Sequence, residues 1–379
     1  MKNNNKIIIA TGIFPPEIGG PATHSLLLAT ELQKSGVDVV VVAYSDDKKE
    51  YDFKVIRISR KQNILKRYFK YFYAILKESN KNSIVYAQDP ISSGLPACFA
   101  SAFRRARFIL KIVGDYAWEQ GSSRRNVKDS IEDFQAKKYG FFVSVLKFLE
   151  RFVAKRASDL VVPSQFLKSI VLKWGVKESR IRVVLNSYTK KDNIVCKNIH
   201  TDKKIIVSVA RLVPWKGLDQ LIKIMPEILE KNPDIILNII GDGPEKNNLE
   251  NLIEDLDLKE KVVLLGSISK DDVFCELKRS GVFVLNTSYE GLSHILLEAL
   301  DAKVPIITTN VGGNPEVITN EENGVLVEIG DSEKLKREIL RLFGDEESRN
   351  YLIKNGEKSL EKFKKEKMIS EIFNILKIK

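Results

Sequence analysis

Two glutamates eight positions apart, Glu290 and Glu298, frame a stretch whose residue types could hold a sugar nucleotide. The apolar run 282–285 predicts a buried strand, and Ser293 is a suitable N-cap for the helix expected after it. The amides of residues 292–294 would have no partner inside that helix, which suits a phosphate. Glu298 would lie about 7 Å further along the helix axis. One carboxylate could therefore reach a sugar and the other a ribose, on opposite sides of a diphosphate.

A surface helix with two solvated glutamates would explain the same spacing, because Glu is common on helix surfaces. A second pair of charges favours the site. Arg211 and Lys216 follow the predicted strand 205–210 in the run R-L-V-P-W-K-G. Two cations in a strand-to-helix turn suit a diphosphate, Arg through its planar fork and Lys as a point charge. A solvated basic loop is the alternative for this pair.

Short apolar runs alternate with helical segments along the whole chain and must position these residues. This alternation predicts an α/β protein with parallel sheets and crossover helices, and 379 residues exceed a single core. The polar, irregular residues 189–203 are the best linker. We therefore expect an N-terminal domain over 1–188, a second domain over 204–360 and a C-terminal helix over 361–379.

The first predicted strand is followed by a glycine pair, Gly19-Gly20, where doubly wound sheets bind ligands. Paired glycines let the backbone approach a phosphate closely, although a plain loop would also use them. His24 begins the next helix. It could cap the helix or lie on the surface, and its place beside the glycine loop also makes an acceptor contact plausible.

Charge is divided unevenly between the two halves of a chain whose net charge is +11. Residues 1–199 hold 35 Lys and Arg against 18 Asp and Glu, which leaves 26 against 32 in residues 200–379. The first half therefore carries +17 and the second −6. Such asymmetry indicates a polyanionic partner for the first half: nucleic acid, acidic membrane or phosphorylated substrate.

Three distant cysteines and three histidines limit the chemistry. The cysteines fit neither a disulfide framework nor a metal site, and suit a reducing cytoplasm. The histidines are too few for a histidine-rich metal centre. No apolar run is long enough for a spanning helix, and we expect no signal peptide.

Three basic segments also contain aromatic residues: 63–77, 102–108 and 137–156. In the first of them, Leu65, Phe69, Phe72 and Leu76 share a helix face, most of which we expect to pack on the sheet. The excess of Phe and Tyr beside Lys and Arg leaves a membrane-surface role plausible.

Taken together, E-x7-E and R-x4-K-G resemble the signature of retaining glycosyltransferases of family 4, and the resemblance runs from the first strand to about Asp331. It implies a GT-B type fold, with two doubly wound Rossmann-like domains facing a central cleft and the terminal helix packing back on the first domain. It also implies donor-binding roles for Gly19, Gly20, Arg211, Lys216, Gly241, Gly266, Glu290, Gly291, Leu292, Ser293 and Glu298.

One departure concerns catalysis. Many family members place a histidine near the anomeric carbon, where this chain has G-D-Y-A-W-E (114–119). Asp115 is the nearest polar replacement, and with Glu290 it is our candidate catalytic residue. Glu119 and His24 are candidates for the acceptor side. A capping or turn aspartate is the alternative for Asp115.

The resemblance predicts retaining transfer of a hexose-type sugar from a nucleotide diphosphate sugar to a glycan or lipid-linked acceptor, in cell-surface polysaccharide or glycolipid assembly. We expect no metal or other cofactor, and peripheral contact with anionic membrane at the cytoplasmic face. A sugar-nucleotide epimerase and a non-catalytic nucleotide-sugar-binding protein are the alternatives. A nucleic-acid partner would explain the basic first half but not the second-half motifs, so we do not expect one.

Overall fold

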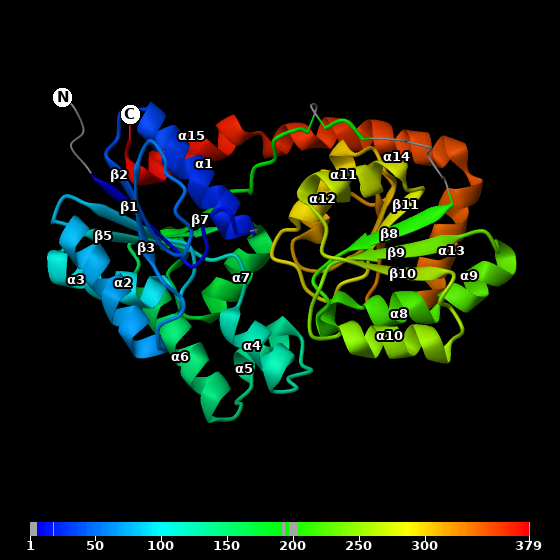
Figure 1. The fold of residues 1–379 in the computed structure, drawn as a ribbon, viewed down its shortest axis with the longest axis horizontal. Helices are drawn as coiled ribbons and strands as arrows, with labels where there is room; N and C mark the ends of the chain where they lie inside the picture. The colour runs from blue at the N-terminus through cyan, green and yellow to red at the C-terminus, as the bar shows by residue number, and fades with distance from the viewer. Residues whose placement is uncertain (1–5, 18, 192–193, 197–203, 379) are drawn as a thin grey trace. The chain divides into compact units, whose positions relative to one another are not determined.

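The computed structural model describes residues 6–17, 19–191, 194–196 and 204–378. Residues 192–193 and 197–203 of the predicted linker lie outside the described residues. The chain divides into two compact units. The first comprises Met1–Gly121, Asp129–Leu185 and Glu366–Lys379, and the second comprises Ser122–Lys128 and Asn186–Lys365. Both are α/β units built on a parallel sheet, as the alternating pattern predicts (Figure 1).

The first unit contains a seven-stranded sheet in the order β3-β2-β1-β4-β5-β6-β7, with every neighbouring pair parallel. Its central strands are buried along their whole length, because helices cover both faces of the sheet. The strands are β1 (Ile7–Thr11), β2 (Val39–Tyr44), β3 (Lys54–Ile58), β4 (Ile84–Ala87), β5 (Arg107–Lys111), β6 (Asp159–Val162) and β7 (Ile181–Val183).

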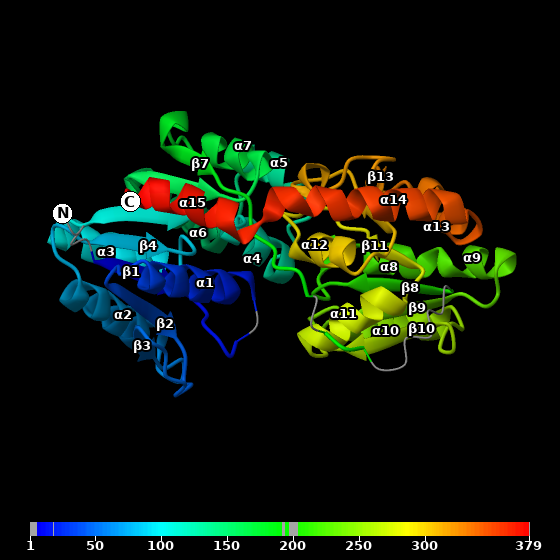
Figure 2. The same ribbon diagram turned by 90° about the horizontal axis from the view of Figure 1, so that it is seen from above.

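The helices that belong wholly or mainly to the first unit are α1 (Gly20–Lys34), α2 (Ile64–Glu78), α3 (Gly94–Arg104), α4 (Tyr116–Arg124), α5 (Ile131–Ala136), α6 (Phe141–Arg156), α7 (Gln165–Lys173), the short 3-10 helix η1 (Glu178–Arg180), and α15 (Lys365–Leu376) from the end of the chain. Helices α1 and α15 cover one face, and α2, α3 and α6 lie on the other (Figures 1 and 2). Met368 and Ile372 of α15 join Leu28 and Leu32 of α1 in one apolar core over the sheet.

Helix α2 shows a different buried face from the one its sequence predicts. Leu65 and Phe69 are 81% and 67% exposed. The helix instead packs through Tyr71 and Ile75, and the Tyr71 hydroxyl donates to the carbonyl oxygens of Thr11 and Val42 at 3.0 and 2.6 Å. The prediction that most of the Leu65–Phe69 face packs on the sheet is wrong, because a tyrosine can fill the core and still donate to strand carbonyls.

The second unit contains a six-stranded parallel sheet in the order β10-β9-β8-β11-β12-β13. Helices α8, α9, α10 and α13 contribute to the apolar core on one face. Helices α11 and α12 lie on the other face (Figure 1). The strands are β8 (Ile205–Val209), β9 (Ile236–Ile240), β10 (Val262–Gly266), β11 (Val282–Leu285), β12 (Ile306–Thr309) and β13 (Val325–Val327). The helices are η2 (Pro214–Lys216), α8 (Leu218–Lys223), α9 (Met225–Lys231), α10 (Lys246–Asp255), α11 (Lys270–Arg279), α12 (His294–Asp301), η3 (Asn314–Glu316), α13 (Ser332–Gly344), α14 (Glu346–Ser359) and η4 (Leu360–Phe363).

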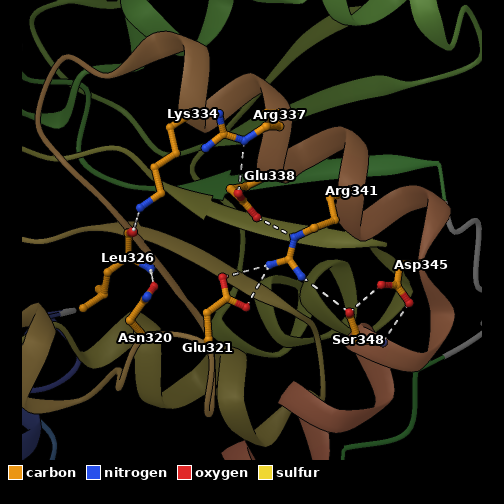
Figure 3. A network of polar contacts seen from close by, with 9 residues as sticks. All are labelled: Asn320, Glu321, Leu326, Lys334, Arg337, Glu338, Arg341, Asp345 and Ser348. Carbon is orange, nitrogen blue, oxygen red and sulfur yellow. Dashed lines mark hydrogen bonds and ion pairs between the residues drawn. The ribbon is translucent and has the colours of Figure 1, made fainter.

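Helix α13 is held to its neighbours by a polar network (Figure 3). The Arg341 guanidinium binds Glu338 within the helix at 2.6 Å and both carboxylate oxygens of Glu321 at 3.1 Å. The Asp345 carboxylate caps α14 by accepting from the Ser348 amide at 2.9 Å. These contacts fix the end of α13 against the start of α14.

The cysteines correct another expectation. Cys196 and Cys275 form a disulfide that joins the segment before β8 to α11, across a sequence separation of 79. The prediction that the cysteines form no disulfide is therefore wrong. Cys98 is free and buried, and burial raises the pKa of its thiol to about 11.

Candidate functional site

The loops that follow the parallel strands of the second sheet emerge at one edge, and two of them are tightly joined there. The loop after β8 contacts the turn after β11 through Trp215, whose carbonyl oxygen accepts from the Ser288 amide at 2.7 Å and the Thr287 hydroxyl at 3.0 Å. The Asn286 side-chain amide donates to the Gly217 carbonyl at 3.0 Å. The R-x4-K-G and E-x7-E motifs are thus brought together.

An ion pair lies where these two loops meet. The Lys216 ammonium binds the Glu290 carboxylate, and both side chains are largely buried, at 13% and 16% exposed. The Arg211 guanidinium lies over the Trp215 ring, 5.4 Å from its centroid. The site therefore combines two cations with one carboxylate, as the sequence predicts for a diphosphate beside a sugar.

The turn that contains Glu290 is supported by the glycine pair after β12. Gly312 has a φ of +57°, and a Cβ atom there would lie 2.1 Å from the Glu290 carbonyl oxygen. The Gly313 amide donates to that same oxygen at 2.9 Å. Only glycine permits this approach, so Gly312 and Gly313 position the turn although sequence reasoning gave them no role.

Two amides of the same turn are available to a ligand. Ser293 is the N-cap of α12 by position, but its side chain makes no capping hydrogen bond. Within the described part of the chain, the Leu292 and Ser293 amides have no hydrogen-bond acceptor. A helix start with amides of this kind can bind an anionic oxygen.

Glu298 has a partner that sequence reasoning missed. Its carboxylate binds the Lys191 ammonium at 2.9 Å, and Asp301 accepts from the Lys191 amide at 2.9 Å and the Tyr188 hydroxyl at 2.7 Å. The segment before the second sheet is therefore fixed to α12. The basic pair Lys190-Lys191, at the start of a polar linker, is the sequence signal that could have indicated this contact.

The remaining predicted glycines of this unit lie beside the same loops. The Gly241 amide donates to the Gly266 carbonyl at 2.9 Å, so the turns after β9 and β10 are in contact. The Leu212 amide donates to the Asp242 carbonyl at 3.0 Å, which joins the turn after β9 to the Arg211 loop. Gly241 and Gly266 are thus close to the cationic loop in the structure.

In the first unit, Gly19 is the N-cap of α1 and Gly20 its first residue. His24 is buried, with Nδ1 3.0 Å from the Lys111 ammonium and Nε2 3.5 Å from the Tyr86 hydroxyl. Burial lowers the pKa of Lys111 to about 7. Sequence reasoning missed Lys111, although a lysine that ends the apolar strand F-I-L-K is an unusual residue for a buried position.

Asp115 is fully buried and has both oxygens occupied. It accepts from the Trp118 amide at 2.8 Å and from the Gln135 side-chain amide at 2.7 Å. Burial, and then the adjacent Asp115 carboxylate, raise the pKa of Glu150 well above its usual range. This geometry favours the capping alternative for Asp115. Glu119 lies one turn further on in α4, where its amide donates to the Asp115 carbonyl at 3.0 Å.

Neither a spanning helix nor a metal cluster is found in the part of the chain that the structure describes. No helix there has both the length and the apolarity needed to cross a bilayer. Within the same residues, no three His, Cys, Asp or Glu side chains are grouped as metal ligands.

Comparison with known families covers both units. The profile described as Glycosyltransferase Family 4 matches residues 18–188, and the profile described as Glycosyl transferases group 1 matches residues 190–359. An uncharacterized glycosyltransferase of Methanocaldococcus jannaschii is 26% identical over 98% of both chains. The capsular polysaccharide biosynthesis glycosyltransferase CapM of Staphylococcus aureus is 30% identical over 59% of this chain and 62% of that protein.

Solved structures share the fold. Anabaena HepE, in a complex with UDP-glucose, superposes with a TM-score of 0.76 at 18% identity, over 98% of this chain and 99% of that one. Sucrose-phosphate synthase from Thermosynechococcus elongatus gives a TM-score of 0.77 at 17% identity, over 98% of both chains.

Proposed function

Since this chain belongs to family 4 of the glycosyltransferases and has their two-domain GT-B fold, we propose that it transfers a hexose-type sugar, with retention at the anomeric carbon, from a nucleotide diphosphate sugar to a glycan or lipid-linked acceptor. The observation that carries the proposal is the contact between Lys216 and Glu290 beside the amides of Leu292 and Ser293. One site thus offers groups for a sugar and for a diphosphate.

The proposed chemistry places positive groups where charge develops. When the bond between the anomeric carbon and the phosphate oxygen breaks, negative charge grows on the diphosphate. Arg211, Lys216 and the two amides would stabilise that charge, and Glu290 would hold sugar hydroxyls. Glu298, oriented by Lys191, would hold the ribose. We propose that these groups act without a metal ion, so transfer should persist in the presence of a chelator.

A panel of sugar nucleotides tests the donor. A donor present at 100 times its Kd should raise the free energy of unfolding by about 2.7 kcal/mol. The stabilising nucleotide sugar is then incubated with candidate glycan and lipid-linked acceptors. Nucleoside diphosphate release that requires an acceptor supports transfer. Acceptor-independent interconversion of the sugar would indicate an epimerase, and binding without turnover a binding protein. The anomeric configuration of the product tests retention.

The first unit supports a peripheral membrane location, in cell-surface polysaccharide or glycolipid assembly at the cytoplasmic face. Helix α2 contacts α3, and α3 contacts α6. Along these helices runs an aromatic ridge, in which neighbouring rings within 6.5 Å pair Phe69 with Phe72, Phe72 with Phe103, Phe99 with Phe152, and Phe148 with Phe152. Three of its members, Phe69, Phe103 and Phe148, are more than 60% exposed.

Exposed rings beside cations suit an anionic membrane surface. Each Lys or Arg near such a surface contributes about 1 kcal/mol, and aromatic side chains add apolar insertion. The ridge therefore gives the excess positive charge of the first unit an apolar anchor, which a soluble phosphorylated acceptor would not need.

Sedimentation with phosphatidylcholine vesicles, with and without phosphatidylglycerol, tests this location. Lys66→Glu with Lys70→Glu, and separately Phe69→Ser with Phe103→Ser, should weaken binding to the anionic vesicles. Lys173→Glu with Lys177→Glu is the matched control, because both lysines are exposed and lie outside the ridge. We leave Arg67 unchanged, since its guanidinium lies 5.1 Å from the Tyr44 ring centroid. Absence of binding at low salt would rule out the membrane location.

A further inference from the structure

A basic cavity lies between α5, the loop after it, and α6. Its volume is about 550 Å³, within the roughly 300–1,000 Å³ of small-molecule sites. Six of its lining residues are cationic: Lys137, Lys138, Lys147, Arg151, Lys155 and Arg156. None of the lining residues that the structure describes is acidic. All of them belong to the first unit.

The cations are concentrated on one stripe of α6. Lys147, Arg151 and Lys155 recur every four residues, so their side chains lie along one side of the helix. Like charges at this spacing destabilise a helix. Lys137 is neutralised by Asp129 at 2.5 Å, whereas in the described part of the chain no carboxylate lies within ion-pair distance of the three stripe residues.

Two of these cations differ in how well their own packing satisfies them: Lys147 finds acceptors in the protein, and Arg151 is left with one unsatisfied donor. The Lys147 ammonium is buried and donates to the carbonyl oxygens of Phe134 and Lys137 at 2.5 and 2.9 Å. Burial, and then the nearby Arg151 charge, lower the pKa of Lys147. Arg151 donates through Nη2 to Gln135, but among the described residues its buried Nε has no acceptor. An anion in the cavity would relieve the repulsion and could satisfy that donor.

We propose that this cavity binds a phosphate or diphosphate group, and that in the proposed reaction the group belongs to the acceptor. The inference rests on the proposed function only for the second statement. Arg151 and Lys155 would hold the anionic oxygens, and Lys147 would add charge from the cavity wall.

The position of the ridge indicates what is attached to that group. Phe148 and Phe152 line the cavity and also belong to the aromatic ridge. The Arg156 guanidinium stacks on Phe152, 3.6 Å from the ring centroid. Phosphate-binding cations are therefore continuous with an apolar surface, the arrangement that a phosphate attached to a lipid would require. A free phosphate has the same oxygens but no use for the rings.

Inorganic pyrophosphate is the first probe, followed by phosphatidylcholine vesicles with and without phosphatidic acid. Since pyrophosphate could also occupy the donor site, calorimetry is done in full-length protein carrying Arg211→Ala and Lys216→Ala. In that background Arg151→Gln with Lys155→Gln should weaken pyrophosphate or phosphatidic acid binding about tenfold or more, because two charge-assisted hydrogen bonds are lost. Lys173→Gln with Lys177→Gln removes the same charge elsewhere and should leave both affinities within about twofold.

Each outcome decides the proposal. A selective loss of pyrophosphate binding supports a site for a soluble phosphate, and a selective loss confined to phosphatidic acid vesicles supports a lipid phosphate. Equal effects of the two double variants on both probes would overturn it. Lys155→Gln alone, at an exposed position, should still weaken binding if the first double variant fails to fold. Donor turnover by the unmodified protein is measured separately, so that failure of the cavity and failure of the proposed function are distinguishable.

Discussion

The two units share one strand order, but the turns at equivalent positions of the two sheets differ in their hydrogen bonding. Strand order β3-β2-β1-β4-β5-β6 in the first corresponds to β10-β9-β8-β11-β12-β13 in the second, and the first adds β7 at its edge. Strands β4 and β11 therefore occupy equivalent places. After β11, Glu290 binds a lysine from another loop and two amides are left for a ligand.

In the turn after β4, the polar groups are hydrogen-bonded to one another. The Asp89 carboxylate accepts from the amides of Ile91, Ser92 and Ser93 at 3.0, 2.5 and 3.1 Å, and from both serine hydroxyls at 2.8 and 2.6 Å. At this topological position, polar groups of the turn are therefore left for a ligand in the second unit. In the first unit, the polar groups of the turn are hydrogen-bonded to one another. Strand order fixes where a site can be, and the turn's own hydrogen bonds decide whether a ligand can use it.

The charges follow the same division. In the first unit Lys111 and Glu150 are buried. Burial lowers the pKa of Lys111 and raises the pKa of Glu150, so the neutral form of each is favoured. Changes in the second unit should therefore affect transfer, whereas changes to these buried groups should affect stability and its dependence on pH.

The largest effect is expected from Lys216→Ala. Removing one group that stabilises developing charge typically costs about 10²–10³-fold in kcat. The melting temperature should also fall, because the substitution leaves the largely buried Glu290 carboxylate unpaired, so kcat is compared at a temperature where the variant is folded. Lys223→Ala on α8 is the control, and its kcat should match that of the unmodified protein. Full activity of Lys216→Ala at saturating donor would show that the cation loop is not part of the site.

Gly312→Ala should disturb both stability and transfer. A Cβ atom would contact the Glu290 carbonyl in a backbone conformation that alanine rarely adopts, which costs about 1–3 kcal/mol of unfolding free energy. Gly330→Ala separates the two causes, since Gly330 also has a positive φ of +79° but has no atom within 4 Å of its Cβ position. Equal losses in the two variants would mean that contact with the Glu290 turn is unimportant.

Lys111→Met should change how stability depends on pH. Between the folded pKa of about 7 and the higher pKa of an unfolded lysine, the folded state binds fewer protons, so the stability of the unmodified protein rises with pH. The slope can reach about 1.4 kcal/mol per pH unit, and the variant should lack it. Denaturant titrations between pH 7 and 10 measure the difference. Parallel curves would show that Lys111 is not buried as a neutral amine.

Glu150→Gln should show the opposite sign. The raised pKa keeps a proton on folded Glu150 above the pH at which an unfolded glutamate loses its own. The stability of the unmodified protein should therefore fall as pH rises above about 4.5, again by at most about 1.4 kcal/mol per unit. The glutamine variant should become relatively more stable toward neutral pH. An unchanged difference between pH 4 and 7 would contradict a protonated Glu150.

Asp115→Asn should have the smallest effect on transfer. If Asp115 only caps α4, turnover should remain within about threefold, because asparagine caps a helix as well as aspartate does. The melting temperature should still fall, because the asparagine NH2 group cannot accept the hydrogen bond from the Gln135 side-chain amide, which costs about 1 kcal/mol. A much larger fall in turnover at unchanged donor affinity would restore Asp115 as a catalytic residue. Glu119→Gln, on the same helix, is the comparison variant.

The candidate donor site could be proposed from the sequence because its parts are local. E-x7-E and R-x4-K-G each occupy one strand-turn-helix segment, so spacing alone places their charges at a sheet edge. The missed contacts are distant in sequence: Lys191 and Glu298 are 107 residues apart, and His24 and Lys111 are 87 apart. The disulfide has a separation of 79. A local pattern such as Lys190-Lys191 can mark one member of such a pair, but it does not identify the distant partner.

The prediction of which face of α2 is buried was wrong for another reason. Apolar periodicity ranks Leu and Phe above Tyr, but Tyr71 supplies both bulk and a hydroxyl for two strand carbonyls. A hydropathy pattern takes no account of the need of these buried carbonyl oxygens for a hydrogen-bond donor. The exposed apolar residues of α2, which contradict the predicted buried face, support the membrane proposal.

The return of α15 to the first core has a consequence for recombination. Met368, Ile372 and Leu376 complete the apolar core that β1 and α1 begin, so a fragment that stops at Leu185 would leave that core uncovered. A functional hybrid that takes the segment Asn186–Lys365 of the second unit from a relative would need two crossovers, near residues 186 and 365. The host's own last helix would be retained. Gene fusions with a single crossover would instead pair a foreign α15 with the native core.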